Sequence, residues 1–186
     1  ISSLGRVDQT HLRTGNFPDE DWSRINTAVQ LMSEAPIYID DTPSLSPTEI
    51  RARSRRLQRE HGLDLLVVDY LQLMQVEGSK ENRATEIAEI SRGLKALAKE
   101  LDVPVIALSQ LNRSVEQRTD KRPVMSDLRE SGAIEQDADV VLGLWRDRDL
   151  GGDPTMDIEI LKNRQGPLAR VGVEFEGDYV RFATEE

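Results

Sequence analysis

The stretch from Leu63 to Tyr70 constrains the fold more than any other part of this sequence. Its centre, Leu65 to Val68, is an unbroken aliphatic run that is entered through Gly62. A short, continuous apolar run of this kind is typical of a strand that is buried on both faces of a parallel sheet. Asp69 comes directly after the run. It therefore places a carboxylate at the carboxyl edge of the sheet, where α/β proteins bind their ligands.

This aspartate has two interpretations. It can simply mark the point where the strand leaves the core and meets solvent. A hydrophobic strand that ends in aspartate is also what P-loop NTPases use to hold Mg²⁺ beside the phosphates of a nucleotide. The stretch fits both interpretations, so the choice between them depends on the rest of the chain.

Apolar periodicity and capping residues predict an alternation of strands and helices. Helices are expected at 19–34, 47–61, 83–101 and 126–136, and short strands at 37–39, 103–108, 138–145 and 156–161. Residues 170–175 and 179–182 are expected to pair as a hairpin across Gly177-Asp178. This alternation indicates an α/β fold, with a mostly parallel sheet flanked by helices and an antiparallel hairpin on its C-terminal side.

The composition excludes several kinds of site. The chain has no cysteine, which excludes disulfides and thiolate metal sites, and its 2 histidines, His11 and His61, are far apart. Its 186 residues are enough for one domain with a core of its own. No apolar run approaches the length of a membrane span, and the first residues carry no apolar leader segment. We therefore expect a cytoplasmic protein that makes no membrane contact.

The formal net charge of -10 argues against nucleic-acid binding through the overall field of the protein. It leaves room for local basic patches. One is the predicted helix 47–61, which carries Arg51, Arg53, Arg55, Arg56 and Arg59, and the other is a polar loop with Arg113, Arg118, Lys121 and Arg122. The arginine-rich helix is either a solvated face, with Glu49 and Glu60 as local partners, or a surface that contacts another subunit or a loading protein.

Polar side chains also follow the second predicted buried strand, where Ser109 and Gln110 come directly after Leu108. In a parallel sheet the tips of neighbouring strands lie on one edge, so these groups can converge with Asp69. Asp69 could then hold Mg²⁺ through water, while Ser109 and Gln110 could sense a γ-phosphate through hydrogen bonds. Each signal also has a plain interpretation, because many strands end in a polar residue.

The sequence motifs around these residues resemble those of the motor domain of bacterial DnaB-type replicative helicases. The resemblance runs from about Ser3 to Phe182, which is nearly the whole chain, and long motifs in the same order make it highly specific. The segments that carry it are Asp69–Met74, Glu86–Arg92 with Leu94–Glu100, Ala107–Arg113, Lys121–Pro123, and Asp127–Gly132 with Ile134–Asp139.

The resemblance implies a RecA-like P-loop NTPase fold and a homo-hexameric ring around single-stranded DNA. Such a ring binds ATP and Mg²⁺ between neighbouring subunits, translocates on the single strand and unwinds duplex DNA at the replication fork. The family also implies contacts with a primase and a helicase loader. On this interpretation the full protein is an ATP-dependent DNA helicase.

The resemblance also assigns residues to the nucleotide site. Asp69 matches the Walker B aspartate, which binds the metal, and Gln110 matches the γ-phosphate sensor, with Ser109 beside it. Lys162 and Arg164 match the lysine and arginine that reach the nucleotide of the neighbouring subunit. The family's usual glutamine–arginine–asparagine triplet is Asn163-Arg164-Gln165 here, but the arginine and its distance from Lys162 along the chain are kept.

A DNA-binding set follows in the same way. Arg129, Glu130 and Gly132 match the inner loop that holds the DNA backbone, and Arg113 begins the basic loop that leads to it. Taken without the resemblance, the same segment is better interpreted as a plain capped helix from Ser126 to Gln136.

The chain departs from the family in one large respect, because it contains no G-x-x-x-x-G-K-[ST] phosphate loop. In the family this loop, its strand and the strand with the catalytic glutamate precede the segment that matches this chain. We therefore expect residues 1–186 to be the C-terminal portion of a single RecA-like ATPase domain and to be inactive alone. The phosphate-loop strand normally lies inside the sheet, so its absence predicts open strand edges.

Two other functions stay open. The chain could be a non-catalytic RecA-like module that self-assembles or binds a partner through its basic patches, and the missing phosphate loop favours this alternative. It could also be another RecA-like ATPase, such as a recombinase or a clock ATPase. The runs Ser109–Arg113 and Asp127–Asp139 argue against the second alternative.

Overall fold

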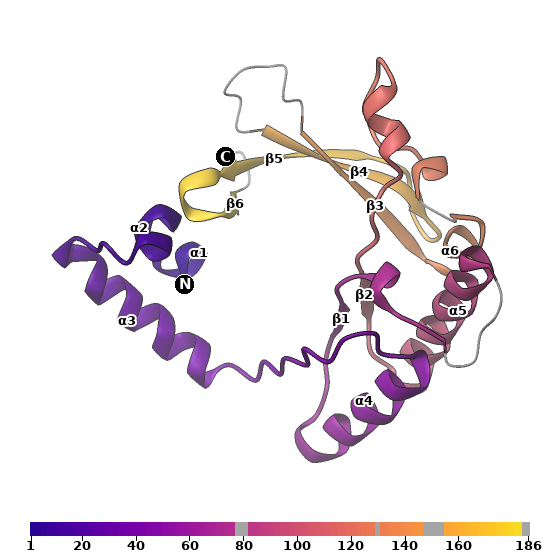
Figure 1. Ribbon diagram of the computed structural model, residues 1–186, viewed down its shortest axis with the longest axis horizontal. Coiled ribbons are helices and arrows are strands. Elements are labelled where there is room, and N and C mark those ends of the chain that lie inside the picture. Colours follow the sequence, from indigo (N-terminus) through magenta and orange to yellow (C-terminus); the bar gives the residue numbers. More distant parts are fainter. Residues whose placement is uncertain (77–81, 129–130, 147–154, 184–186) are drawn as a thin grey trace. The chain divides into compact units, whose positions relative to one another are not determined.

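The computed structural model describes residues 1–76, 82–128, 131–146 and 155–183 (Figure 1). The chain divides into two compact units. The terminal unit contains Ile1–Asp40, Leu144–Ile158 and Arg170–Glu186, and the central unit contains Asp41–Gly143 and Glu159–Ala169. All of the predicted site residues that the structure describes belong to the central unit.

The terminal unit begins with three helices, α1 (Ser2–Gly5), α2 (Gln9–Thr14) and α3 (Asp19–Glu34). The bounds of α3 match the prediction. Its first turn carries Asp19, Glu20 and Asp21, and carboxylates there are favoured by the helix dipole. Asp21 is buried and lies 2.7 Å from the Nδ1 atom of His11 in α2, so this contact fastens α2 to α3.

Residues 37–39, which the sequence predicts as a short strand, form no strand in the structure. A strand is stable only when its backbone pairs with a neighbour. No described strand pairs with this segment, and Ile39 is 88% exposed. The prediction of a strand at 37–39 is therefore wrong.

The central unit is built around α4 (Pro47–His61) and α5 (Arg83–Leu101), whose bounds match the predicted helices. α4 begins with the predicted capping box. The Ser46 side chain accepts a hydrogen bond from the Glu49 N–H at 3.2 Å, and the Glu49 carboxylate accepts one from the Ser46 N–H at 2.8 Å. The side chain of Asn82 caps α5.

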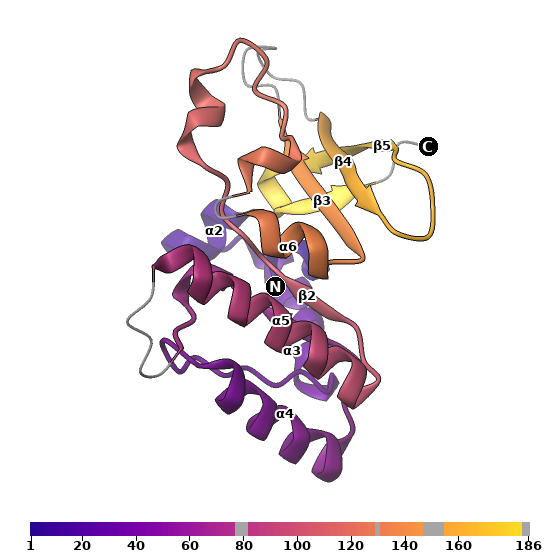
Figure 2. The ribbon, with the colours of Figure 1, turned by 90° about the vertical axis from the view of Figure 1, so that its right-hand side faces the viewer.

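One hydrophobic core fills the central unit. α5 supplies much of it, and Ile87 and Ile90 on this helix are fully buried. α5 packs against α4 on one side and against α6 (Ser131–Asp137) on the other, as Figure 2 shows. No helix in the described part of the chain combines the length and the apolar character needed to cross a membrane.

The strands form two separate sheets. β1 (Leu66–Val68) pairs in parallel with β2 (Val105–Ala107), and neither pairs with a third strand among the described residues. The other sheet has the order β3-β4-β5-β6, formed by Val140–Trp145, Thr155–Asn163, Arg170–Glu176 and Arg181–Ala183. β5 and β6 are antiparallel and are joined by the 3₁₀ turn η4 (Gly177–Tyr179). The predicted α/β fold and its C-terminal hairpin are confirmed.

The prediction that the strands are buried on both faces is wrong. Val68 is buried in β1, but its neighbour Val67 is 54% exposed, and Ile106 in β2 is 50% exposed. Successive side chains of a strand point to opposite faces. α4, α5 and α6 all lie on the same side of the β1–β2 pair (Figures 1 and 2). Because no described helix of the central unit covers the other side, its aliphatic residues Val67 and Ile106 are exposed.

The arginine-rich face of α4 is directed mainly at its own chain. Arg51 and Arg55 both pair with Glu100 of α5, the first at 2.7 Å. The Arg51 guanidinium is the main cause that holds the pKa of the Glu100 carboxyl below its usual range. Arg56 pairs with Glu60 one turn along α4, at 3.0 Å. The two pairs with Glu100 fasten α4 to α5, a role that neither interpretation of the sequence included.

The helix predicted at 126–136 is wrong at its N-terminal end. The structure has a short 3₁₀ helix, η3 (Met125–Asp127), and α6 begins only at Ser131. Leu128 between them is extended and forms an isolated antiparallel bridge with Leu111. A residue whose backbone pairs as a bridge cannot also belong to a helix, so the helix starts later than its capping residues suggest.

Gly143 allows β3 to pack closely against its neighbours. A Cβ atom at this position would lie 2.8 Å from the Cβ atom of Pro123 and 3.1 Å from the Cδ1 atom of Leu161. Both distances are shorter than an ordinary contact between carbon atoms. Glycine at this strand position is therefore required by the close approach of two other segments.

Candidate functional site

Asp69, Ser109 and Gln110 lie at the carboxyl edge of the β1–β2 pair. Asp69 directly follows β1, and Ser109 and Gln110 follow shortly after the end of β2. The two segments stay together beyond the last paired residues, because the Leu71 N–H donates to the Leu108 carbonyl at 2.9 Å. Asp69 and Gln110 are not buried. The three polar residues therefore emerge at one edge of the sheet.

Gln72 joins the two strand tips. Its side-chain Nε2 donates to the Ser109 hydroxyl at 3.0 Å, and its Oε1 accepts from the Gln110 N–H at 3.3 Å. Gln72 itself lies in the 3₁₀ helix η1 (Leu71–Leu73), directly after the β1 strand and its aspartate. One amide group therefore sets the position of the backbone that carries Gln110 relative to the segment that carries Asp69.

A single metal-binding carboxylate fits this edge. No hydrogen bond or ion pair to a described residue occupies Asp69, so both of its oxygen atoms are available. Among the residues that the structure describes, no group of three or more Asp, Glu or His side chains could hold a metal ion. Mg²⁺ keeps several of its waters and is commonly bound by one or two carboxylates together with substrate phosphates. The residues present fit that ion, with Asp69 as its protein ligand.

A hollow of about 370 Å³ lies beside Gln110 and is lined by residues 110–113. It leads into the 3₁₀ helix η2 (Arg113–Gln117), whose first turn is capped by the Asn112 side chain. Arg113 is exposed at the start of this helix. The predicted γ-phosphate sensor and the first arginine of the basic loop therefore border the same hollow.

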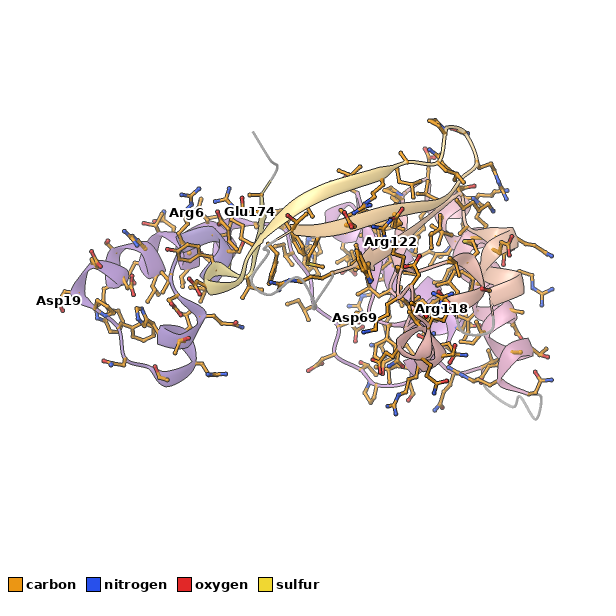
Figure 3. The ribbon with its side chains drawn as sticks, turned by 90° about the horizontal axis from the view of Figure 1, so that it is seen from above. Arg6, Asp19, Asp69, Arg118, Arg122 and Glu174 are labelled. Atoms are coloured by element: carbon orange, nitrogen blue, oxygen red, sulfur yellow. The ribbon has the colours of Figure 1, made fainter. Side chains whose placement is uncertain are left out.

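The basic loop that follows is held by one ion pair, whose carboxylate is buried. Asp127 is 5% exposed and lies 2.7 Å from the Arg118 guanidinium. The same carboxylate accepts the Val124 N–H at 2.8 Å, and Arg118 donates to the Arg122 carbonyl at 2.7 Å. Arg118, Arg122 and Asp69 are labelled in Figure 3. Arg118 is thus a structural residue of the loop, whereas Arg113 is available to a ligand.

Lys162 and Arg164 lie at the end of β4 and are held by the C-terminal end of α6. The Lys162 ammonium donates to the carbonyl of Glu135, and to that of Ala138 at 2.7 Å. The Arg164 guanidinium donates to the carbonyl of Gln136 at 2.8 Å. The last carbonyls of a helix have no partner within the helix. The two cations supply those partners.

Asp139 completes this cluster. Its carboxylate pairs with Arg164 at 3.1 Å and with Lys95 of α5. The hydrogen bond from Lys95 is the main cause that lowers the pKa of Asp139, and the charges of Arg164 and Lys162 lower it further. Asp139 therefore stays ionised and holds Arg164 in addition to the helix carbonyl.

The structure brings the predicted residues together in two groups. None of the hydrogen bonds and ion pairs between described residues joins Lys162 or Arg164 to Asp69, Ser109 or Gln110. Gly132 is exposed in the first turn of α6. Arg129 and Glu130, the other predicted DNA-binding residues, lie outside the described residues. A single copy of the chain therefore has the edge with Asp69, Ser109 and Gln110 and a separate cationic cluster.

The profile of the DnaB-like helicase C-terminal domain matches residues 1–184. The chain belongs to this family. The match covers the edge with Asp69 and Gln110 and the cluster with Lys162 and Arg164, so both groups lie within one family domain.

Relatives in this DnaB-like family share about half of their residues with the chain. Replicative DNA helicase DnaB of Buchnera aphidicola subsp. Acyrthosiphon pisum is 55% identical over 190 residues, which are 98% of this chain and 41% of that protein. Replicative DNA helicase DnaB of Geobacillus stearothermophilus is 54% identical over 191 residues, which are 100% of this chain and 42% of that protein. The chain thus spans about two fifths of the length of these relatives.

Two solved structures have the same fold as this DnaB-like chain. One is an ATPase domain that superposes with a TM-score of 0.93 at 38% identity, covering 100% of this chain and 68% of that one. The other is a DnaB-like replicative helicase, whose interactions with primase were described with its structure. It also gives a TM-score of 0.93 at 38% identity, covering 100% of this chain and 46% of that one.

Several residues of this DnaB-like site escaped the sequence interpretation. Gln72 lies in the motif Asp69–Met74, yet its role as a link between two strand tips depends on Ser109 and Gln110, which are far away in the sequence. Lys95 and Asp139 were also inside motifs without an assigned role. The sequence shows each of them as a polar or charged residue beside a buried strand or helix, but it does not identify the residue that each one contacts.

Proposed function

We propose that this chain is part of the ATP-driven motor of a ring-shaped replicative DNA helicase. The family membership supports this proposal. The observation that carries it is that Asp69 and Gln110 lie at the same edge of the sheet, where hydrogen bonds of Gln72 connect the two segments. The active assembly is a homo-hexamer that moves on single-stranded DNA and works with a primase and a helicase loader. Residues 1–186 form the C-terminal portion of a single RecA-like ATPase domain.

Each residue of the edge has a role in this proposal. Asp69 holds Mg²⁺ through water, and Gln110, with Ser109 beside it, donates to the γ-phosphate of ATP. When bound, Mg²⁺ neutralises charge that develops on the phosphates. Lys162 and Arg164 act on the nucleotide of the neighbouring subunit. An arginine suits that task because its charge is permanent and its planar fork matches phosphate oxygens.

A mixing experiment tests the nucleotide half of this proposal. Full-length rings with Asp69→Asn or Arg164→Ala should each lose most ATP hydrolysis, because an arginine finger alone contributes roughly 10³- to 10⁵-fold in rate. In rings assembled from both variants, some interfaces pair an intact Asp69 with an intact Arg164 of the neighbour. Part of the ATPase activity should return on mixing.

The control is Asp64→Asn, which removes an exposed carboxylate before β1, at the opposite end of the strand. It should keep normal ATP hydrolysis. Normal turnover in Asp69→Asn with unchanged thermal unfolding would favour the non-catalytic binding module instead. A lack of recovery in rings that do exchange subunits would show that Arg164 acts within its own subunit.

The DNA half is tested by salt dependence. Arg113, Arg129, Glu130 and Gly132 contact the phosphate backbone in this proposal, and phosphate contacts carry no sequence information. Arg129→Ala in the full-length ring should therefore weaken binding of oligo-dT and of mixed-sequence strands equally. The slope of log affinity against log salt should become shallower by about 0.7, the value for one phosphate on a single strand. An unchanged slope and affinity would remove Arg129 from the interface.

A further inference from the structure

The C-terminal end of α6 carries an excess of negative charge. Its last carbonyls point away from the helix, and Asp137 adds a carboxylate where the helix dipole disfavours one. One oxygen of Asp137 is buried and has no hydrogen-bond partner among the described residues. Asp139 follows two residues later. Cations against this end of the helix are therefore stabilising.

Lys162 and Arg164 are those cations. Lys162 donates to two carbonyls of this end and Arg164 to a third, while Arg164 also pairs with Asp139 at 3.1 Å. The backbone joins the same contact, because the Arg164 N–H donates to the Asp139 carbonyl at 2.8 Å. The donors of both side chains are thus aimed into their own chain.

We propose that Lys162 and Arg164 alternate between two positions, the C-terminal end of α6 in their own subunit and the nucleotide of the neighbouring subunit. This inference rests on the proposed function, since the second position is the one suggested above. A donor directed at an α6 carbonyl cannot at the same time point across a subunit boundary. A bound triphosphate therefore draws the two cations away, and the end of α6 loses its partners.

The structure allows such an exchange. The Arg164 side chain is 48% exposed, so it can leave without opening the core. For Lys162 a phosphate offers full negative charges in place of carbonyl dipoles, and hydrogen bonds to ionised acceptors are about twice as strong as those to neutral ones. Arg164 exchanges one carbonyl and the Asp139 carboxylate for the phosphate. Lys95 remains on Asp139 after Arg164 leaves, so that carboxylate keeps a partner in both positions.

α6 is suited to respond. It has 7 residues, and a helix of two turns depends on its caps and its packing because propagation contributes little. Its first turn contains Gly132, beside the segment that we assign to DNA binding. Nucleotide binding at one site would therefore change the stability of α6, beside the proposed DNA-binding segment, in the adjacent subunit.

Amide hydrogen exchange in the full-length ring tests this inference directly. The peptide that spans Ile134 to Asp139 reports on the end of α6, where the Ala138 N–H donates to the Ile134 carbonyl at 3.0 Å. We expect exchange in this peptide to be roughly five-fold or more faster with a non-hydrolysable ATP analogue than with ADP, the lower range of a coupling between two sites. Equal or slower exchange with the analogue would overturn the inference without any variant.

Lys162→Met keeps the length of the side chain and removes its charge. In this variant, exchange of the peptide with ADP should be faster than in the wild type, so the ratio between the two states falls and only the contribution of Arg164 remains. Lys99→Met, which removes an exposed lysine of α5, is the matched control and should keep the wild-type ratio. A wild-type ratio in Lys162→Met would also overturn the inference.

The two proposals fail in different measurements. If the proposed function is wrong, ATP hydrolysis by the variants and by the mixed rings will contradict it. If only this inference is wrong, the hydrogen exchange of α6 will contradict it, while Arg164→Ala still loses most ATP hydrolysis.

Discussion

At the scale of single residues, the buried carboxylate of Asp127 illustrates how one charge can fix a loop. It holds the Arg118 guanidinium and the Val124 N–H, both within 2.8 Å. Arg118 depends on it as well, because the Nε atom of Arg118 is buried without a partner among the described residues. A buried charge is tolerable only with such partners, so the shape of the basic loop depends on this pair.

Asp127→Asn should destabilise the protein by about 1–3 kcal/mol, because it leaves the Arg118 guanidinium without its counter-ion. The matched control is Glu60→Gln, which breaks the exposed pair between Arg56 and Glu60 of α4. Exposed pairs contribute about 0–1 kcal/mol. Urea unfolding of both variants beside the wild type measures the difference. Equal effects of the two substitutions would show that the pair with the buried Asp127 carboxylate stabilises the protein no more than an exposed pair does.

Glu86 makes the stability of the protein depend on pH in the acidic range. Its carboxylate accepts the Val76 N–H at 2.8 Å, and this bond is the main cause that lowers the pKa of Glu86, against the opposing effect of burial. Arg83 pairs with the same carboxylate and also donates to the carbonyls of Gln72 and Met74. Glu86 therefore ties the segment after β1, which carries Gln72, to the first turn of α5.

The sign of the pH effect follows from this lowered pKa. An unfolded glutamate titrates near pH ~4.3, so the stabilisation is fully present above that pH and is lost as the pH falls through the lower folded pKa. Urea midpoints measured from about pH 7 down to about pH 3 should show wild type more stable than Glu86→Gln near neutrality, with the gap closing in acid. A gap of constant size would contradict this assignment.

The residues that the sequence could place are those whose position follows from the order of the strands. Asp69 and Gln110 follow aliphatic runs, so the edge they share could be predicted from strand order alone. Gln72, Lys95 and Asp139 act through partners that a sequence pattern does not identify. Arg118 was grouped with the basic loop for its charge, but its charge is used internally.

At the scale of elements, helices were predicted well where caps and apolar spacing agree. α3 and α5 have their predicted bounds, and α5 is flanked by Asn82 and by Asp102 in a left-handed conformation. The strands were predicted less well, because a strand is defined by its neighbour. Residues 37–39 have no partner strand among the described residues, and β1 and β2 keep one open face. The helix at 126–136 starts late because Leu128 pairs with Leu111.

Gly143→Ala tests the close packing of β3. The new Cβ atom would meet Pro123 and Leu161, and the Pro123 ring cannot rotate away. Overpacking of this kind typically costs about 1–3 kcal/mol. Gly172→Ala in β5 is the matched control, since its Cβ would meet only the Thr155 methyl group at 3.9 Å, an ordinary contact. We expect that control to stay within about 0.5 kcal/mol of wild type in thermal unfolding.

At the scale of the whole molecule, the residues present supply only part of a phosphate site. In the proposed function Asp69 and Gln110 engage the metal and the terminal phosphate, but no Gly-rich loop in this sequence cradles the other phosphates. Phosphoryl transfer depends almost entirely on positioning and charge stabilisation. The polypeptide 1–186 alone should therefore show no ATP hydrolysis above buffer, with or without single-stranded DNA. Turnover that Asp69→Asn abolishes would contradict this prediction, and full-length protein is the positive control.

The pairing of two arginines with one glutamate has a consequence for how this domain tolerates mutation over generations. If Arg51 is replaced, Arg55 still pairs with Glu100, and if Arg55 is replaced, Arg51 still does. Either arginine can therefore be substituted while an ion pair still joins α4 to α5. Loss of Glu100 leaves both cations without this partner at once. Selection should therefore act strongly on the single acidic position and weakly on each basic one, although charge counting alone would rank all three alike.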